Sequence, residues 1–559
     1  MSPDAMSTAL QTICDRFPDS WTLSYCGITP AQQSIPILLN RYAYTHNTDA
    51  SRILVISGLD TKPFDSDKAK NLLDCILSEK QHHDSNWAIS VIPDANPSKT
   101  FDLSSPYPPE SGFFYDKETP EARYLWRHIC WQAPDLVIEI LYGETDSVEC
   151  NIATIESIPA FADNNQLSDG AGLLSALGTG QPDGLGPICG VRLTARPESL
   201  ETQFNNLLSK LGSQKLISPA ADTQDTRRSR LPLTVSAVLA KTYGHQLDPV
   251  NYTQGVGISG RIQLHLLDPS SESPAQDITD LVEPYVSKQK DLFQNEPGGA
   301  NLAGLTWAYE LFQLTGDPRY KDLIIETANR YRPGSSGTAP YPCDPEFRTE
   351  DMFMSGTMLG KAFEVTQDHV YIDILTRFLL DGHIQTENGL FWHCRSAPYY
   401  WGRGNGFAAL GLSETLTYLP ETNTAKSEII TMYQKLMQAL ALTQKMSGML
   451  PQVLDSPGSY EEFTATCMFG IAMSRGLLHG WLNPECQSQL KLAWQGVNER
   501  IDEHGNIVDG CISTGVQNNV QEYLDRHAIF GPDDRSGGMA LWFSLEIAKL
   551  SKSGISLIA

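Results

Sequence analysis

A repeat in the C-terminal half constrains the fold of this chain more than any other sequence feature. Residues 312–322 (FQLTGDPRYKD) recur as residues 363–373 (FEVTQDHVYID), with an offset of 51 residues. In each copy an apolar helix ends at Thr-Gly or Thr-Gln, and an Asp then caps the next helix. Such a unit is a helical hairpin, and roughly six units of this length fit between about Leu231 and the end of the chain. The repeat therefore predicts a closed six-hairpin α/α toroid or, as the alternative, a linear helical solenoid.

Further apolar stretches in this half have helical periodicity. We expect helices over Asn301–Leu314, Asp322–Tyr331, Phe407–Tyr418, Ala425–Met446, Thr464–His479, Gln487–Glu499 and Gly537–Leu550.

The N-terminal third has a different pattern. Runs of β-branched and apolar residues at Arg52–Ser57, Trp87–Ile92 and Leu136–Leu141 are separated by helix-like stretches. This alternation predicts a three-layer α/β domain. A chain of 559 residues with 41% hydrophobic content is also too long for one compact core. We therefore predict a multi-domain protein with an α/β domain at 1–215, a linker at 216–231 and an all-α domain at 232–559.

Aromatic, charged and glycine residues are concentrated at residues 387–419 (ENGLFWHCRSAPYYWGRGNGFAALGLSETLTYL). Trp392 and Trp401 have flat apolar faces on which a pyranose can stack, while His393 and Arg403 can hold a proton or a carboxylate. The glycines on either side of Arg403 and Asn405 let the backbone approach a ligand closely. The segment indicates a sugar-binding loop; the alternative is a buried aromatic cluster at a glycine-rich helix start.

Two adjacent carboxylates, Glu350 and Asp351, open an apolar helix after a loop rich in Pro and Gly. Successive helical residues point about 100° apart, so we expect only one of the two to face a pocket while the other caps the helix start. Mutual repulsion would raise the pKa of one carboxyl, whereas the helix N-terminus would lower it. The alternative is that both are ordinary helix-start residues.

Together these segments resemble the unsaturated glucuronyl and rhamnogalacturonyl hydrolases of glycoside hydrolase families 88 and 105. In those families one pocket is lined by an acidic residue four positions before a Met, a His in a GLWYH-like run and a WARGNGW run. The corresponding residues here are Glu350 with Met354, His393, and 401–407 (WGRGNGF). A third block, 460–469 (YEEFTATCMF), is similar to the family run YxETSATAMF and contains Glu462. The matches keep the family order over roughly 330 residues.

The resemblance implies an (α/α)6 toroid, a six-hairpin barrel, that hydrolyses oligosaccharides with an unsaturated uronic acid at the non-reducing end. Protonation of the C4=C5 enol ether at C4 gives an oxocarbenium at C5, water adds there, and the hemiketal opens to expel the aglycone. One carboxyl group acts as acid and then base, and Glu350 occupies its position with Asp351 beside it. Where the family has a second pocket Asp, this chain has Asn301.

The resemblance and the residue types together give the expected ligand contacts. Arg403 is expected to bind the substrate carboxylate as a bidentate pair, and His393 a ring hydroxyl or the catalytic water. The expected catalytic residues are Glu350 and Asp351, and the expected substrate-binding residues are Asn301, Met354, Trp392, His393, Trp401, Arg403, Asn405 and Glu462.

The N-terminal third resembles the zinc carboxypeptidase (M14) scaffold at Gly58-Leu-Asp60, Asn96-Pro97 and Thr119-Pro-Glu121-Ala. A zinc site of that type needs a His-x-x-Glu pair after the first strand and a later His. No His lies between His46 and His82, and the later strand reads Glu-Ile-Leu-Tyr-Gly-Glu. We expect a degenerate accessory domain without metal, and no cofactor for the chain.

Charge and composition limit the partners. The formal net charge of −25 argues against binding to nucleic acid or an anionic membrane, although a local Arg and His pocket can still hold an anionic oligosaccharide. The first residues lack a basic segment followed by an apolar run, and no apolar stretch of about 18 residues occurs. Eleven scattered cysteines indicate reduced thiols. These features predict a cytoplasmic protein.

Three functions remain open at this point. The first is the unsaturated uronyl hydrolase. The second is another (α/α)6 enzyme, a hydrolase of saturated sugars or an epimerase, which Asn301 favours. The third is a non-catalytic carbohydrate-binding or scaffold protein, which the degenerate N-terminal domain makes plausible.

Overall fold

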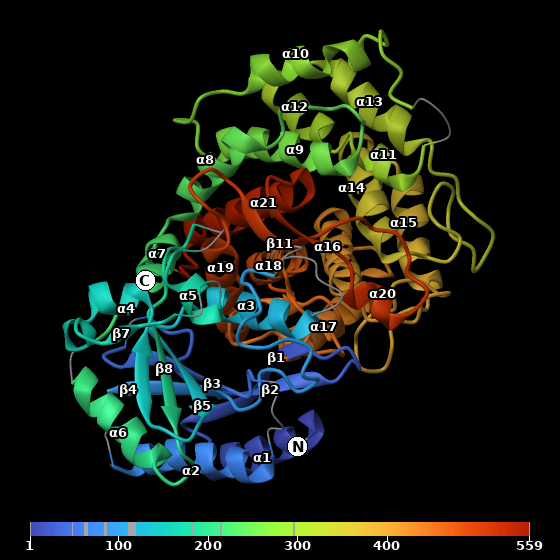
Figure 1. The fold of residues 1–559 in the computed structure, drawn as a ribbon. Helices are drawn as coiled ribbons and strands as arrows, with labels where there is room; N and C mark the ends of the chain where they lie inside the picture. The colour runs from blue at the N-terminus through green and yellow to red at the C-terminus, as the bar shows by residue number, and fades with distance from the viewer. Residues whose placement is uncertain are drawn as a thin grey trace. The chain divides into compact units, whose positions relative to one another are not determined.

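The computed structural model describes residues 2–46, 48–60, 65–82, 86–109, 119–168, 170, 172–180, 184–212, 215–293 and 297–557. They form two compact units (Figure 1). The first comprises Met1–Ser229 with the short segment Ser456–Tyr460, and the second comprises Arg230–Asp455 with Glu461–Ala559.

The first unit is built on a mixed sheet of eight strands in the order β1-β2-β4-β3-β5-β8-β6-β7. Strands β4, β3, β5 and β8 are parallel neighbours, and β1, β2 and β6 join through antiparallel pairs. The strands are β1 (Trp21–Ile28), β2 (Ser34–Asn40), β3 (Ser51–Ser57), β4 (Trp87–Ile92), β5 (Leu136–Tyr142), β6 (Ser147–Cys150), β7 (Asn165–Gln166) and β8 (Gly190–Ala195). The three strands expected from the sequence are confirmed as β3, β4 and β5.

Helices cover both faces of this sheet (Figure 1). Ile53 and Val55 of β3 pack in one core with Leu10 of α1, Leu72 of α2 and Leu207 of α6, as the period of two in a strand requires. Helix α3 lies on the opposite face (Figure 1). The helices are α1 (Pro3–Arg16), α2 (Ser66–His82), α3 (Pro120–Gln132), α4 (Ile152–Ser157), α5 (Leu173–Leu177), α6 (Leu200–Leu211) and α7 (Pro219–Arg228).

The expected linker at 216–231 contains helix α7. Ser218 caps this helix by accepting the backbone N–H of Ala221, and Pro219 occupies its first turn. The two compact units meet in sequence between Ser229 and Arg230. The division into 1–215, 216–231 and 232–559 stays a prediction.

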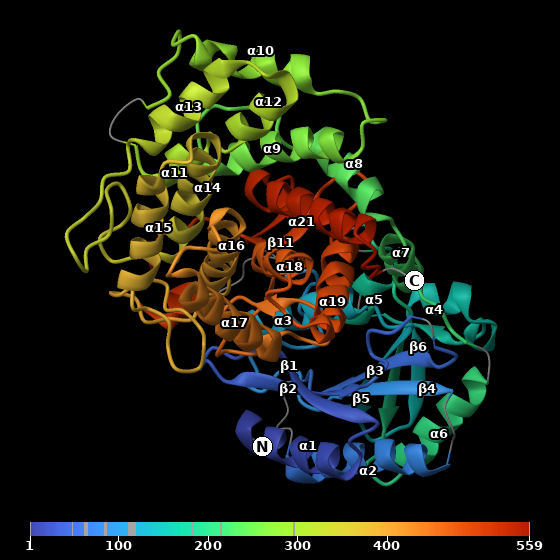
Figure 2. The same ribbon diagram turned by 180° about the vertical axis from the view of Figure 1, so that it is seen from behind.

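The second unit is a toroid of helical hairpins (Figure 2). In the described part of the chain its inner ring consists of α9, the broken pair α11 and α12, α14, α16, α18 and α21, each packed against the next. Helix α21 packs against α9 and closes the ring. The closed toroid is thus confirmed, and the linear solenoid is wrong.

The inner helices are α9 (Tyr252–Leu267), α11 (Gly299–Ala303), α12 (Trp307–Thr315), α14 (Thr349–Thr366), α16 (Gly402–Tyr418), α18 (Phe463–Leu478) and α21 (Asp534–Lys552). The outer helices are α8 (Pro232–Thr242), α10 (Ala275–Val286), α13 (Pro318–Ala328), α15 (His369–Asp381), α17 (Lys426–Thr443) and α19 (Gln487–Glu499). Helix α20 (Val520–Leu524), strands β9 (Leu450–Pro451) and β10 (Glu461–Glu462), and the hairpin of β11 (Ile507–Cys511) with β12 (Ala528–Gly531) lie in the connections.

The repeat seen in the sequence forms the expected hairpins. Gly316 (φ 73°) follows the last residue of α12 and Gln367 (φ 59°) that of α14, and both have the left-handed conformation typical of a helix C-cap. Asp317 and Asp368 then cap α13 and α15, each accepting a backbone N–H two residues further on.

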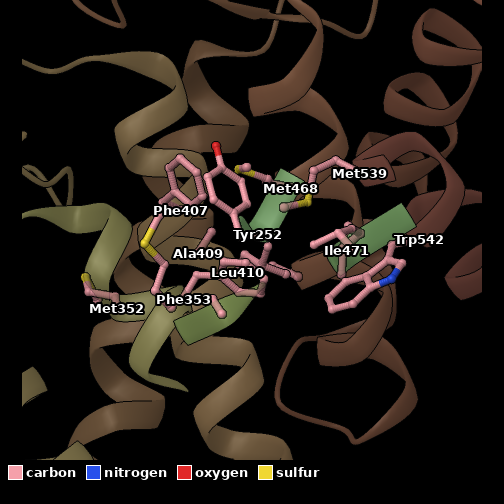
Figure 3. Packing of buried hydrophobic residues seen from close by; sticks show 14 of the residues in the cluster. Tyr252, Met352, Phe353, Phe407, Ala409, Leu410, Met468, Ile471, Met539 and Trp542 are labelled. Atoms are coloured by element: carbon pink, nitrogen blue, oxygen red, sulfur yellow. The ribbon is translucent and has the colours of Figure 1, made fainter. Parts of the chain in front are cut away.

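Large apolar side chains fill the centre of the toroid (Figure 3). The ring of Phe353 lies 6.2 Å from that of Phe407 and 6.0 Å from that of Trp542, and Tyr252 lies 5.7 Å from Phe407. These four residues come from four different inner helices. The middle of the ring is therefore closely packed with apolar side chains.

No helix among the described residues is both long and apolar enough to cross a membrane.

Candidate active site

Residues expected from the sequence to form the site lie at the N-terminal ends of inner helices. Glu350 and Asp351 open α14, Arg403 is in the first turn of α16, Glu462 caps α18, and Asn301 lies in α11. Because outer and inner helices alternate along the chain, with α11 and α12 counted as one broken helix, the inner helices run in the same direction and their N-termini lie at one end of the toroid. Helix N-termini favour negative charge at this end.

Glu350 and His393 form a buried pair. Both carboxylate oxygens of Glu350 lie 3.1 Å from Nε2 of His393, and both side chains are fully buried. The loop that carries His393 is held against α14 because the backbone N–H of Thr349 donates to the carbonyl of His393 at 3.1 Å. Burial raises the pKa of the Glu350 carboxyl, but attraction and hydrogen bonding by His393, with the charge of Arg348, lower it by more. The net pKa lies below the ordinary value, so the structure favours an ionised Glu350.

Asp351 has a different environment. Its Oδ2 accepts the backbone N–H of Asp344 at 2.8 Å, and its Oδ1 abuts the start of α11, where a Cβ added to Gly299 would lie only 2.6 Å away. Burial, together with the charge of Glu350, raises the pKa of Asp351 to about 7 against the opposing effects of that hydrogen bond and of Arg348. The two neighbouring carboxyls thus face different partners, and their pKa values are pushed apart.

Tyr523 of α20 completes the environment of His393. Its hydroxyl lies 2.6 Å from His393 Nδ1 and accepts the backbone N–H of Gln517 at 3.2 Å. The Tyr523 ring also contacts the rings of Tyr399 and Trp401, with centroid distances of 5.4 and 6.2 Å. Sequence reasoning missed Tyr523, because residues 520–526 (VQEYLDR) carry no local pattern that distinguishes a site residue.

Trp401 and Arg403 lie in the interior of this cluster. The fully buried indole of Trp401 is approached by the guanidinium groups of Arg403 and Arg526, whose carbons lie 4.9 and 4.7 Å from its ring centroid. Arg403 donates hydrogen bonds to the backbone carbonyls of Cys511 and Ser513. A substrate carboxylate would replace these carbonyls as the acceptor. Stacking of a sugar on Trp401 and uronate binding by Arg403 stay predictions.

Asn405 and Glu462 both bind backbone groups. Asn405 accepts the N–H of Phe391 and donates to the carbonyls of Phe391 and Trp401, at 2.7 to 3.1 Å. Glu462 caps α18 and also accepts the N–H of Cys511 at 2.8 Å. These contacts fix the loops around Glu350 and His393.

The remaining expected residues lie at the edges of the cluster. Asn301 donates to the carbonyl of Val250 at 2.9 Å and accepts the N–H of Gly298 at 3.2 Å, which ties α11 to the segment before α9. Met354 is buried beside Gly299, and Trp392 is half-buried against the toroid core. A direct contact of these three residues with substrate stays a prediction.

Among the described residues, no three or more His, Cys, Asp or Glu side chains are placed so that they could hold a metal ion. The side chains of His82 and His83 lie outside the described part of the chain. The absence of zinc stays a prediction.

Comparison with known proteins places this geometry in context. The sequence model of Glycosyl Hydrolase Family 88 matches residues 236–551, more than half of the chain. The chain is 24% identical over 268 residues to the unsaturated rhamnogalacturonyl hydrolase YesR of Bacillus subtilis (strain 168). This match covers 43% of this chain and 74% of that protein. The chain is also 24% identical over 154 residues to the unsaturated 3S-rhamnoglycuronyl hydrolase of Alteromonas sp. (strain LOR), covering 26% of this chain and 36% of that relative.

A solved structure of a family 105 glycoside hydrolase from C. acetobutylicum ATCC 824 has a TM-score of 0.50 with this chain at 18% sequence identity. The likeness covers 56% of this chain and 98% of that structure. It shows the shared (α/α)6 toroid fold.

Proposed function

The chain belongs to glycosyl hydrolase family 88, and from this premise we propose that it removes an unsaturated uronic acid from the non-reducing end of oligosaccharides left by polysaccharide lyases. The names of the two curated relatives, both hydrolases of unsaturated sugars, support this substrate class. The proposed partner is therefore an anionic oligosaccharide.

The observation that carries the proposal is the pair of buried carboxyls at the start of α14. Hydration of the C4=C5 double bond needs a group that donates a proton to C4 and a group that accepts one from the attacking water. Asp351, with its pKa raised to about 7 by burial, keeps a proton close to neutral pH. Glu350, with its pKa lowered despite burial, is ionised at that pH. Environments that push two pKa values apart in this way suit an acid and a base.

We assign proton donation at C4 to Asp351 and activation of water to Glu350. In this scheme the oxocarbenium at C5 is trapped by the water that Glu350 deprotonates, and the resulting hemiketal opens to expel the aglycone. His393, which binds both oxygens of Glu350, orients the base. Asn301 can orient a hydroxyl or the water but cannot share a proton with either carboxyl.

The negative charge of the substrate requires a positively charged side chain in the site. Arg403 is the proposed partner, because a guanidinium gives a carboxylate both charge and a bidentate geometry. Arg403 now donates to the carbonyls of Cys511 and Ser513. When the uronate binds, its carboxylate would replace these two carbonyls as the acceptor. Trp392 and Trp401 are the proposed stacking surfaces, with Met354, Asn405 and Glu462 completing the pocket.

We also propose that residues 1–215 form an accessory module related to the zinc carboxypeptidases but without their metal. In this proposal residues 216–231 link the module to the toroid at 232–559. We further propose that the protein is cytoplasmic. The mixed sheet with helices on both faces supports the relationship.

An assay with a panel of lyase products tests the function. The ultraviolet absorbance of the C4=C5 double bond should fall as the unsaturated sugar is released, and saturated oligosaccharides of the same composition should stay intact. Cleavage of saturated substrates alone would instead support the second type of (α/α)6 enzyme.

A further inference from the structure

Tyr523 holds a defined place in a chain of three buried side chains. Its hydroxyl lies 2.6 Å from Nδ1 of His393, and Nε2 of the same imidazole lies 3.1 Å from each oxygen of Glu350. All three side chains are buried, so water does not compete for these contacts. The three residues come from α20, from the loop before α16 and from α14, and the toroid brings them together.

The donor and the acceptor in the contact between Tyr523 and His393 can be assigned from the protons that each group carries. The backbone N–H of Gln517 can only donate, so it fills an acceptor site on the Tyr523 oxygen at 3.2 Å. The hydroxyl proton is then directed to His393 Nδ1, the acceptor at 2.6 Å. Burial raises the pKa of Tyr523 to about 12, which keeps this proton on the phenol. In the neutral form of His393, Nδ1 therefore accepts, and the single ring proton resides on Nε2, facing Glu350. The cationic form, whose charge attracts the Glu350 carboxylate, carries a proton on both nitrogens.

The reverse arrangement would be costly. If Nδ1 carried the proton and donated it to Tyr523, the phenol proton would have no acceptor in the buried cluster. A buried donor without an acceptor destabilises the folded state because the donor has lost its hydrogen bond to water. Nε2 would also lose the proton that it donates to Glu350, and two acceptors would face each other at 3.1 Å.

We propose that Tyr523 is a positioning residue that fixes the Nε2-protonated tautomer of His393 and thereby orients the Glu350 carboxylate for activation of water. This inference rests on the proposed function, in which Glu350 is the base. Tyr523 acts through His393 and need not touch the substrate.

The surroundings of Tyr523 hold the phenol in place. Asn519 caps α20 by accepting the N–H of Glu522 at 3.0 Å. The ring packs against Tyr399, and the Arg526 guanidinium lies 5.5 Å from its centroid. Loss of the hydroxyl alone should therefore leave the ring where it is.

Tyr523→Phe tests the proposal, with Tyr399→Phe as the matched control. The Tyr399 hydroxyl donates to the carbonyl of Asn518 at 3.0 Å, so it supports the same segment without touching His393. With an unsaturated oligosaccharide as substrate, Tyr523→Phe should lower kcat by about 10- to 100-fold with little change in KM. A loss of activity of this size is typical when a residue that orients a site residue through a hydrogen bond is removed. Tyr399→Phe should keep a kcat close to wild type. Equal losses in both variants, or an unchanged kcat in Tyr523→Phe, would overturn the proposal.

The tautomer can be measured without any substrate. Nitrogen NMR of histidine-labelled protein, with His393→Gln to assign the signal, should show Nε2 protonated and Nδ1 unprotonated in the wild type, and a mixture or the reverse in Tyr523→Phe. The spectrum is recorded at a pH at which the ring is neutral, and a neutral wild-type ring protonated on Nδ1 would contradict the inference whether or not the variant folds. If the wild type turns over no unsaturated sugar while the NMR result is as expected, the proposed function fails, whereas the tautomer that Tyr523 imposes on His393 stands.

Discussion

At the residue scale, the site depends on two adjacent carboxyls with different neighbours. Glu350 receives hydrogen bonds from His393, whereas Asp351 receives one backbone N–H and otherwise faces the start of α11. Neighbouring residues on a helix point in different directions, so one turn of α14 can supply both an ionised and a protonated group.

Removal of either carboxyl should abolish most of the activity. We expect Glu350→Gln and Asp351→Asn each to lower kcat by at least about 100-fold, the scale for loss of a general acid or base. Steady-state kinetics on an unsaturated disaccharide measures this, with Glu346→Gln as the control because Glu346 is an exposed carboxylate on the preceding loop. Near-wild-type turnover in both single variants would show that the assigned chemistry is wrong.

The raised pKa of Asp351 should appear in the pH dependence of stability. In the unfolded chain this carboxyl ionises at its ordinary pKa of 3.8, whereas in the folded protein it ionises at about 7. Between these values the folded state binds more protons, so stability falls as the pH rises and levels off above pH 7. The contribution of Asp351 should drop by about 2–3 kcal/mol from pH 5 to pH 8.

Asp351→Asn removes this titration, so the variant should gain stability relative to wild type as the pH is raised from 5 to 8. Thermal unfolding of both proteins at the two pH values measures the difference. A constant difference at both pH values would mean that Asp351 is ionised throughout.

Arg403 should select for the charge of the ligand. Arg403→Ala should weaken binding of an unsaturated uronic oligosaccharide by about 100-fold or more, because a carboxylate left desolvated without its partner costs roughly 2–5 kcal/mol. Binding of a neutral sugar analogue should hardly change, and Arg403→Lys should restore only part of the loss because it lacks the planar fork.

Calorimetric titration with the charged and neutral ligands measures the selectivity. Arg526→Ala is the control, since Arg526 also lies over Trp401 and binds the carbonyls of Ser513 and Gly515. Equal losses for both ligands in Arg403→Ala would show that Arg403 only holds the segment around Ser513, and the uronate partner would then be sought at His393 or Arg395.

At the element scale, the hairpins of the toroid are encoded locally. Asp368 caps α15 by accepting the backbone N–H of Val370 at 3.0 Å. We expect Asp368→Ala to lower the free energy of unfolding by about 1 kcal/mol, the usual cost of a lost N-cap. Chemical unfolding measures it, and Asp373→Ala, an exposed position in the second turn of the same helix, should cost clearly less. Equal costs would mean that the side-chain cap contributes nothing.

This local encoding explains why much of the fold could be predicted from the sequence. The Asp caps and the Thr-Gly and Thr-Gln turns lie within a few residues of the helices they delimit, and the buried strand β3 contains the apolar run ILVI at residues 53–56. The helix break between α11 and α12 was not predicted. There Gly255 of α9 approaches the chain so closely that a Cβ on it would lie 2.5 Å from the Gly304 carbonyl oxygen.

The candidate site could be predicted only in part, for a physical reason. Glu350, His393, Trp401 and Arg403 occur in local patterns typical of sugar enzymes, and the structure does bring them together. Tyr523 meets His393 across 130 residues of sequence, and only the closure of the ring creates that contact. The carbonyls that bind Arg403 are backbone groups, which no residue type reveals.

At the scale of the whole molecule, a mixed α/β unit and an α/α toroid are combined in one chain. We expect the α/β unit to contain no catalytic zinc, since strand β3 is not followed by the His-x-x-Glu pair that such a site requires. Elemental analysis of purified protein should give far less than one zinc per chain, and a chelator should leave turnover of an unsaturated sugar intact. Tightly held stoichiometric zinc would revive a peptidase function for this unit.

In the function proposed above, the toroid hydrates the double bond of an unsaturated uronic acid. The most direct test follows the ultraviolet absorbance of that double bond when the full chain is mixed with an unsaturated disaccharide, with Glu350→Gln as a parallel sample. We expect that the absorbance falls with the wild type, that the free aglycone appears in equal amount, and that the variant leaves both unchanged. Persistent absorbance with the wild type across disaccharides from all classes of lyase product would contradict it.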